Sequence, residues 1–246
     1  MALLSQLPDG CVDAVITDPP YSSGGQYRGD RTAKTSDKYM NSDTTLTETL
    51  GDFAGDTRDQ RAFGYWCSLW FGEALRVSRQ GAVLVAFIDW RQLPTLSDAV
   101  QAGGWVIRGV AVWDKGPGTR PRLGGFRSQA EFMVWASSGP LPQRPECGTI
   151  PGVIRCNGVQ KDERRHQTQK PEDLMAECIR VCPPGGIVLD PFCGSGSTGV
   201  AALKSGRRFL GFEMTEHYFD VARRRLSGES FRPVNPAQTS LFGGTK

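Results

Sequence analysis

The sequence predicts an α/β domain built around a mainly parallel sheet, because strand-like apolar runs alternate with helix-like segments along the chain. Residues 82–88 form a continuous apolar run, which is typical of a strand covered on both faces. Residues 61–79 place large apolar side chains at helical spacing, and Gly81 ends that pattern. Strands that alternate with helices are usually joined by crossovers, which favour parallel pairing.

The remaining elements follow from the same periodicities and from the glycines and prolines between them. A helix over 93–102 is ended by Gly103 and Gly104, and another helix begins at Pro171, a favoured first-turn residue. Thr215 is expected to cap the last helix. Further helices are predicted at 61–79, 197–205 and 215–226, and strands at 12–17, 82–88, 105–113, 130–136, 187–189 and 208–212.

Composition limits the classes of function. A chain of 246 residues with 39% hydrophobic residues suits one large domain, taken here as 1–246. The net charge of +3 gives a weak overall field, so nucleic-acid binding would depend on local basic clusters. Seven cysteines without a CxxC pair, and only two histidines, argue against zinc. With no signal peptide and no bilayer-spanning run, the sequence predicts a cytoplasmic protein that does not bind membranes.

Several segments lack periodicity. Residues 22–60 are polar and rich in Gly, Ser, Thr and Asp, which is typical of a functional loop, and we expect a mobile loop that faces a macromolecular substrate. The connections within 114–165 are irregular and carry basic residues, which suggests small recognition insertions. The tail, 228–246, is polar and contains prolines.

One short motif follows the first predicted strand: Asp18-Pro19-Pro20-Tyr21. Asp-Pro-Pro also begins ordinary turns, so this tetrapeptide alone is compatible with a simple strand-to-turn junction.

A second motif is a glycine loop between a strand and a helix, Asp190-Pro191-Phe192-Cys193-Gly194-Ser195-Gly196. Its glycines allow the backbone to approach a ligand closely, and the following helix start offers free N–H groups. Glu213, at the end of the next strand, is placed to accept both ribose hydroxyls of a nucleoside. With Gly199 the pattern also matches a dinucleotide-binding unit, but the preceding Asp190-Pro191-Phe192 does not fit that interpretation.

A third element is His166-Gln167-Thr168-Gln169-Lys170-Pro171, directly before a predicted helix. The three elements in this order resemble the beta class of DNA amino-methyltransferases over nearly the whole chain. The resemblance implies a Rossmann-like, S-adenosylmethionine-dependent methyltransferase fold with a circularly permuted motif order. It also implies one antiparallel strand in a mainly parallel sheet, which the hairpin from 105–113 into 130–136 would supply.

The resemblance also implies roles for individual residues. The Asp18 carboxylate and the Pro19 carbonyl would accept the two N–H bonds of an amino group, so that its lone pair is free to attack. Pro20 would help to stiffen the loop, and Tyr21 would stack on a flipped-out base. No metal is required. The implied cofactor contacts are Asp190, Phe192, Cys193, Gly194, Ser195, Gly196, Thr198 and Glu213, together with His166, Thr168 and Lys170 near the methionine end.

The predicted function is adenine-N6 methylation of double-stranded DNA, since Asp at the first motif position favours adenine. Cytosine-N4 methylation is the nearest alternative. A protein glutamine-N5 methyltransferase would place the cofactor loop before the catalytic motif, and a binding module without catalysis would not need intact motifs. Arg120, Arg122 and Arg127 are candidate DNA contacts, although a solvated surface is an equally simple interpretation.

The size of the recognition segments and the tail suggest further partners, and the start of the chain differs from the family. We expect a homodimer, because the recognition segments are small. Gln238-Thr239-Ser240-Leu241-Phe242 resembles peptides that dock on the replication sliding clamp, but the favoured interpretation is that Leu241 and Phe242 pack on the protein body. Family members usually carry an additional strand before the segment that matches 2–7. We expect either a sheet with one strand fewer or another segment in that place.

Overall fold

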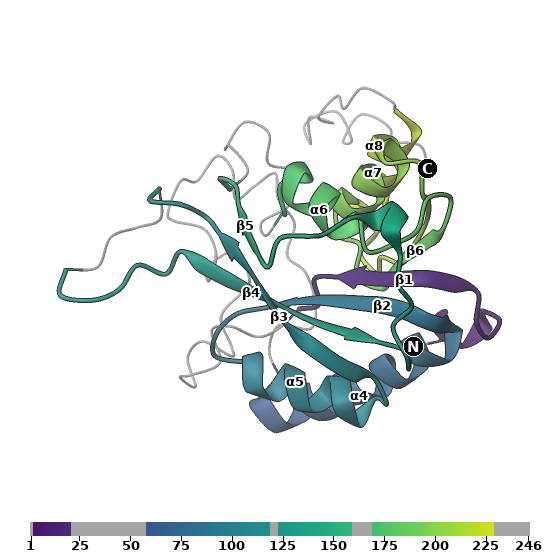
Figure 1. Cartoon of the computed structure of the whole chain (residues 1–246), viewed down its shortest axis with the longest axis horizontal. Helices are drawn as coiled ribbons and strands as arrows, with labels where there is room; N and C mark the ends of the chain where they lie inside the picture. The colour runs from purple at the N-terminus through teal and green to yellow at the C-terminus, as the bar shows by residue number, and fades with distance from the viewer. Residues whose placement is uncertain (1, 21–57, 119–122, 159–168, 229–246) are drawn as a thin grey trace, which may run out of the picture.

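The computed structural model describes residues 2–20, 58–118, 123–158 and 169–228, which form a seven-stranded sheet between two layers of helices (Figure 1). The strand order is β5-β3-β4-β2-β1-β6-β7. β4 runs antiparallel to both of its neighbours, and all other pairs are parallel. The strands are β1 (Val12–Thr17), β2 (Ser78–Ile88), β3 (Val106–Asp114), β4 (Ala130–Ser137), β5 (Val153–Arg155), β6 (Ile187–Asp190) and β7 (Arg208–Gly211).

Helices cover both faces of the sheet. α4 (Gln60–Val77) and α5 (Leu93–Ala102) lie on one face, and α6 (Glu172–Ile179) and α7 (Ser197–Lys204) on the other (Figure 1). α8 (Glu216–Ser227) packs against α7. Two short 3-10 helices, η1 (Leu4–Gln6) and η2 (Pro145–Cys147), complete the described elements.

The periodicity of the sequence explains this arrangement. In α4 the fully buried residues recur every three or four positions, at Phe63, Cys67, Trp70, Phe71 and Ala74, so a single stripe faces the sheet. β2 is buried throughout 81–88, because it lies in the middle of the sheet with helices above and below. The confirmed fold class is therefore an α/β methyltransferase-like sheet, mainly parallel, with β4 as its one reversed strand in the part of the chain described.

Four details differ from the sequence prediction. Residues 78 and 79, expected to end the first long helix, begin β2 instead, and Gly81 lies inside that strand. β5 was not predicted, because a three-residue strand inside an irregular segment has no detectable period. Pro171 is the residue before α6 and not its first residue. Thr215 precedes α8 as expected, but its side chain makes no capping hydrogen bond; its backbone N–H instead donates to Glu213 Oε1, at 2.8 Å.

The two edges of the sheet differ. Among the described residues β7 pairs only with β6, so no described segment takes the place of the additional strand found in the family. At the opposite edge, β5 extends the sheet beyond β3. The hairpin between β3 and β4 projects well beyond the helices (Figure 1). None of the helices in the described ranges has the length and apolarity needed to cross a membrane.

The packing of α4 on α5 gives a test of the fold. A Cβ at Gly103 would lie 2.5 Å from Phe71 Cβ and 3.1 Å from the backbone N of Gly72. Gly103→Ala should therefore lower the free energy of unfolding by about 1–3 kcal/mol, the usual cost of overpacking. Urea-induced unfolding measures the change.

Gly72→Ala is the matched control. No atom lies within 4 Å of a Cβ at Gly72, and this residue lies inside α4, where alanine is favoured by about 1 kcal/mol. We expect this variant to be at least as stable as the parent chain. Equal stability of the Gly103→Ala variant would contradict the close approach of the two helices.

Candidate active site

The two motifs that are far apart in the sequence meet at one edge of the sheet. β1 and β6 are parallel neighbours, so Asp18 and the glycine loop both follow the carboxyl ends of adjacent strands. A buried hydrogen bond joins them directly: Thr17 Oγ1 donates to Asp190 Oδ1 over 2.7 Å. Such an edge is where ligands bind in open α/β sheets.

The Asp190 side chain accepts hydrogen bonds from three groups around the glycine loop. Its Oδ1 also accepts from the N–H of Phe192, at 3.1 Å, and its Oδ2 accepts from Thr198 Oγ1, at 2.6 Å. Burial raises the pKa of Asp190 to about 6, against the opposing effect of these hydrogen bonds. Because its oxygens are engaged by the protein, Asp190 holds β1, the loop and the first turn of α7 together.

The loop itself has the backbone that its glycines allow. Gly194 and Gly196 have φ values of 49° and 82°, in the left-handed region that other residues rarely adopt. A Cβ at Gly196 would lie 3.1 Å from Ala222 Cβ on α8. Glu213 Oε2 accepts from the N–H of Gly194 at 2.9 Å, which places that carboxylate against the loop. The two glycines therefore put no side chain between the loop backbone and a ligand, and the Glu213 carboxylate lies beside them.

Arg225 fixes the outer side of the loop. This α8 side chain donates to Ser195 O at 2.6 Å and to Glu172 Oε1, at the start of α6, at 3.0 Å. It thereby links α8, the loop and α6. Gly199, the third glycine of the pattern, serves packing: a Cβ there would lie 2.7 Å from Phe209 and Leu226.

Phe192 forms an aromatic cluster with α4. Its ring centroid lies 5.3 Å from that of Trp66 and 5.1 Å from that of Trp70. Trp70 is fully buried, as expected of a core residue, whereas Trp66 is only partly buried and carries Arg58 over its ring at 4.1 Å. The cluster makes one wall of the loop apolar.

Asp18 lies among charged groups but keeps one oxygen unpaired. Its Oδ2 forms an ion pair with Lys170 Nζ at 2.5 Å. Its Oδ1 is out of contact with solvent and has no hydrogen-bond partner in the part of the chain that the structure describes. A buried acceptor without a partner typically costs about 1–3 kcal/mol, so it calls for a donor. Burial is the main cause that raises the pKa of Asp18 to about 6, and Lys170 opposes it.

Glu131 and Lys115 continue this set of charges. Lys170 Nζ also lies 3.0 Å from Glu131 Oε1, and Lys115 Nζ lies 2.6 Å from Glu131 Oε2. Burial alone would raise the pKa of Glu131, but Lys170 and Lys115 outweigh it and the net shift is downward. Burial would lower the pKa of Lys170, but Asp18 and Glu131 raise it to about 12.

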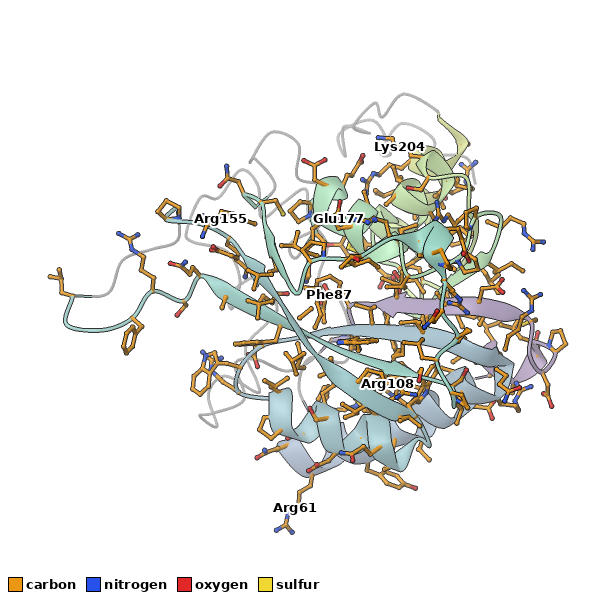
Figure 2. All side chains as sticks on the ribbon, viewed as in Figure 1. Arg61, Phe87, Arg108, Arg155, Glu177 and Lys204 are labelled. Atoms are coloured by element: carbon orange, nitrogen blue, oxygen red, sulfur yellow. The ribbon has the colours of Figure 1, made fainter. Side chains whose placement is uncertain are left out.

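Phe87 completes the surroundings of the ammonium group. It lies near the middle of the molecule, between the sheet and α6, and its ring centroid is 5.1 Å from Lys170 Nζ (Figure 2). The arrangement as a whole places an anchored carboxylate and a glycine loop side by side at the carboxyl edge of the sheet. No group of three His, Cys, Asp or Glu residues placed to hold a metal occurs within the described ranges.

The structure brings together most of the predicted site residues and adds others. Asp18, Pro19 and Pro20 follow β1, and the loop with Glu213 lies beside them. Lys170 was expected at the methionine end of the cofactor; the structure shows its ammonium bound to Asp18 and Glu131. Tyr21, His166, Thr168, Arg120 and Arg122 lie outside the described residues, as do loop residues 22–57 and Gln238–Phe242.

Arg127 is placed, and its guanidinium donates to Pro117 O at 2.7 Å across the β3–β4 hairpin. The sequence motifs do not include Glu131, whose contacts with Lys115 and Lys170 appear only in the structure. The topology offers a signal for this position. Because β4 runs opposite to β2 and β3, its first residues lie beside the carboxyl ends of those two strands.

The family to which the chain belongs follows from its similarity to known proteins. The family model described as DNA methylase matches residues 12–146 and 141–224. The chain is also 30% identical over 226 residues to the putative methylase YubD of Escherichia coli K12, covering 92% of this chain and 86% of that protein. The chain belongs to the DNA methylase family. It is a DNA amino-methyltransferase of the N6/N4 group, and its methyl donor is S-adenosylmethionine.

Other similar proteins agree with this assignment. The type II methyltransferase M.HinfI of Haemophilus influenzae is 27% identical over 252 residues, which cover 91% of this methyltransferase but only 65% of M.HinfI. Among solved structures, the M1.HpyAVI–SAM complex shares the fold with a TM-score of 0.63 at 24% identity, covering 91% of both chains. The cytosine-N4-specific PvuII DNA methyltransferase has a TM-score of 0.63 at 17% identity, covering 92% and 90%.

The loop residues of this methyltransferase fit the cofactor. The left-handed glycines leave room for close backbone approach, and Glu213 presents a carboxylate beside Gly194. We predict that Glu213→Ala raises the Kd for S-adenosylmethionine about 10- to 100-fold, because hydrogen bonds to a charged acceptor are worth about 1.5–3 kcal/mol. Isothermal titration calorimetry measures the change.

Glu216→Ala is the control for this experiment. Glu216 is an exposed acid in the first turn of α8, three residues further along the chain, so its loss changes the local charge equally without touching the loop. An unchanged Kd for the Glu213 variant would show that the ribose is held elsewhere.

Proposed function

We propose that the chain is a site-specific DNA adenine-N6 methyltransferase, which acts on an adenine flipped out of double-stranded DNA. The observation that carries the proposal is Asp18 Oδ1, an acceptor beside the glycine loop for which the described residues provide no hydrogen-bond partner. An exocyclic N–H is a donor that satisfies it, and the Pro19 carbonyl would accept the second N–H. Hydrogen bonds to both N–H groups stabilise the positive charge that develops on nitrogen during attack.

The described residues would bind and orient the reactants. The glycine loop and Glu213 hold the cofactor, which supplies an activated methyl group. Asp18 follows β1, next to β6, so it lies at the same edge of the sheet as the glycine loop. The base must leave the duplex to reach this edge, because its amino group is otherwise paired. Tyr21, for which we propose a stacking role, lies outside the described residues.

Asp at the first motif position supports adenine as the target over cytosine. Cytosine-N4 methylation is the alternative, since the PvuII enzyme that shares this fold is cytosine-N4-specific. Membership of the DNA methylase family and the order of the motifs disfavour a protein glutamine-N5 methyltransferase.

Mass spectrometry of nucleosides tests the proposal. The full chain is incubated with S-adenosylmethionine and unmethylated bacterial DNA, and the digested product is expected to contain N6-methyladenine. Asp18→Asn keeps the size of the side chain but removes its charge, and it should lower turnover about 10²- to 10³-fold, the usual loss for one transition-state contact. Its Kd for S-adenosylmethionine should stay close to that of the parent chain. N4-methylcytosine as the sole product would overturn the choice of base.

The partners belong to the same proposal. We propose a homodimer, which light scattering with and without DNA would detect, and DNA contacts by Arg120, Arg122 and Arg127. Docking of Gln238–Phe242 on a sliding clamp stays a proposal, and binding of a peptide over 234–246 to a bacterial clamp tests it. A cytoplasmic location is consistent with such substrates.

A further inference from the structure

Four alternating charges connect separate elements at the catalytic edge. Lys115 follows β3, Glu131 lies at the start of β4, Lys170 precedes α6 and Asp18 follows β1. The successive Nζ–O distances are 2.6, 3.0 and 2.5 Å. The side chains of Glu131 and Lys170 are only 9% and 6% exposed, so screening by water is weak at the centre. The four charges sum to zero.

The two central groups act on Asp18 in opposite ways. Lys170 binds Oδ2 and favours the ionised carboxylate. This contact also orients the group, because with Oδ2 engaged it is Oδ1 that has no hydrogen-bond partner among the described residues. Glu131 contacts the same ammonium, so Asp18 does not receive the whole of its charge. A carboxylate fully neutralised by a buried lysine would be a weaker acceptor for a developing cation.

We propose that Lys170 and Glu131 are positioning residues for methyl transfer: Lys170 orients Asp18 and keeps it ionised, whereas Glu131 shares Lys170 and preserves the strength of Asp18 as an acceptor. Lys115 holds Glu131 in place from the more exposed end. The inference rests on the proposed function, since it assumes that Asp18 binds the substrate amino group.

The other charged groups around Asp18 support this division of roles. Glu131 favours protonation of Asp18, whereas Lys170 and Lys115 oppose it. Asp18 in turn raises the pKa of its neighbour Asp190 on β6. Glu131 also helps to raise the pKa of Asp89, which follows β2. With burial as the largest contribution, the pKa of Asp18 rises to about 6, within the range that activity measurements can reach. Loss of Glu131 therefore lowers this pKa, and loss of either lysine raises it.

The experiment compares three variants of the full chain. We expect Glu131→Gln to move the acid limb of kcat/KM to lower pH, and Lys170→Met to move it to higher pH, each by about one pH unit, the usual effect of a charge within 4–6 Å. Lys115→Met should move it upward by less. A direct titration of the Asp18 carboxyl by 13C NMR in the cofactor-free protein should show the same signs. Turnover should fall in the first two variants, with the Kd for S-adenosylmethionine nearly unchanged.

Controls separate the possible failures. Glu177→Gln removes an acid on α6 that pairs with Arg180 at the surface, and it should leave the pH profile unchanged (Figure 2). If Lys170→Met fails to fold, the test rests on the other two variants: the acid limb should move to lower pH in Glu131→Gln and to higher pH in Lys115→Met. Shifts of the same sign, or no shift, would overturn the inference. Absence of DNA methylation by the parent chain would refute the proposed function alone, because the NMR titration still tests the charge network.

Discussion

The buried hydrogen bond from Thr17 to Asp190 is the constraint on which the site depends. It joins the end of β1 to the end of β6, and so it sets Asp18 and the two prolines after it beside the glycine loop. The same carboxylate also holds the N–H of Phe192 and the hydroxyl of Thr198. A buried carboxylate is costly unless its oxygens are hydrogen-bonded, so the three donors and Asp190 stabilise one another. Displacement of any one of them would disturb both halves of the site.

The charged side chains around Asp18 also stabilise one another, because a buried charge needs a partner. Removing one member of a buried ion pair costs about 3–5 kcal/mol, since it leaves a charge without compensation. Apolar side chains at these positions would be simpler to bury. Lys170 and Glu131 are nevertheless buried there, with the Phe87 ring beside the ammonium group. The charges orient a carboxylate that a hydrophobic replacement could not orient. Stability and positioning are thus achieved by the same contacts, and this is why a test must use the direction of a pKa shift and not only a loss of activity.

The sequence predicted the main elements of the fold well, because each has a clear period or a clear break. β1 and α5 have the predicted bounds, and the antiparallel hairpin of β3 and β4 lies where it was expected. β5 was missed, because three residues cannot show a period. For the site, local motifs predicted Asp18, Gly194 and Glu213, and the structure places each of them just after one of three neighbouring parallel strands. Sequence could not reveal the contact of Lys170 with Asp18, which spans 152 positions and depends on the packing of three separate segments.

The topology of the sheet explains why two motifs far apart in the sequence meet at one edge. A parallel sheet brings together strands by register and not by sequence order, and β1 and β6 are neighbours although the chain passes through four other strands between them. The site requires only that the carboxyl ends of β1 and β6 lie side by side. The segment after β1 and the glycine loop after β6 could therefore occur in either order along a chain and still meet at the same edge. The reversed β4 adds a further consequence: its first residues, and not its last, reach the catalytic edge. That is how Glu131, which begins a strand, comes to share a lysine with Asp18, which follows one.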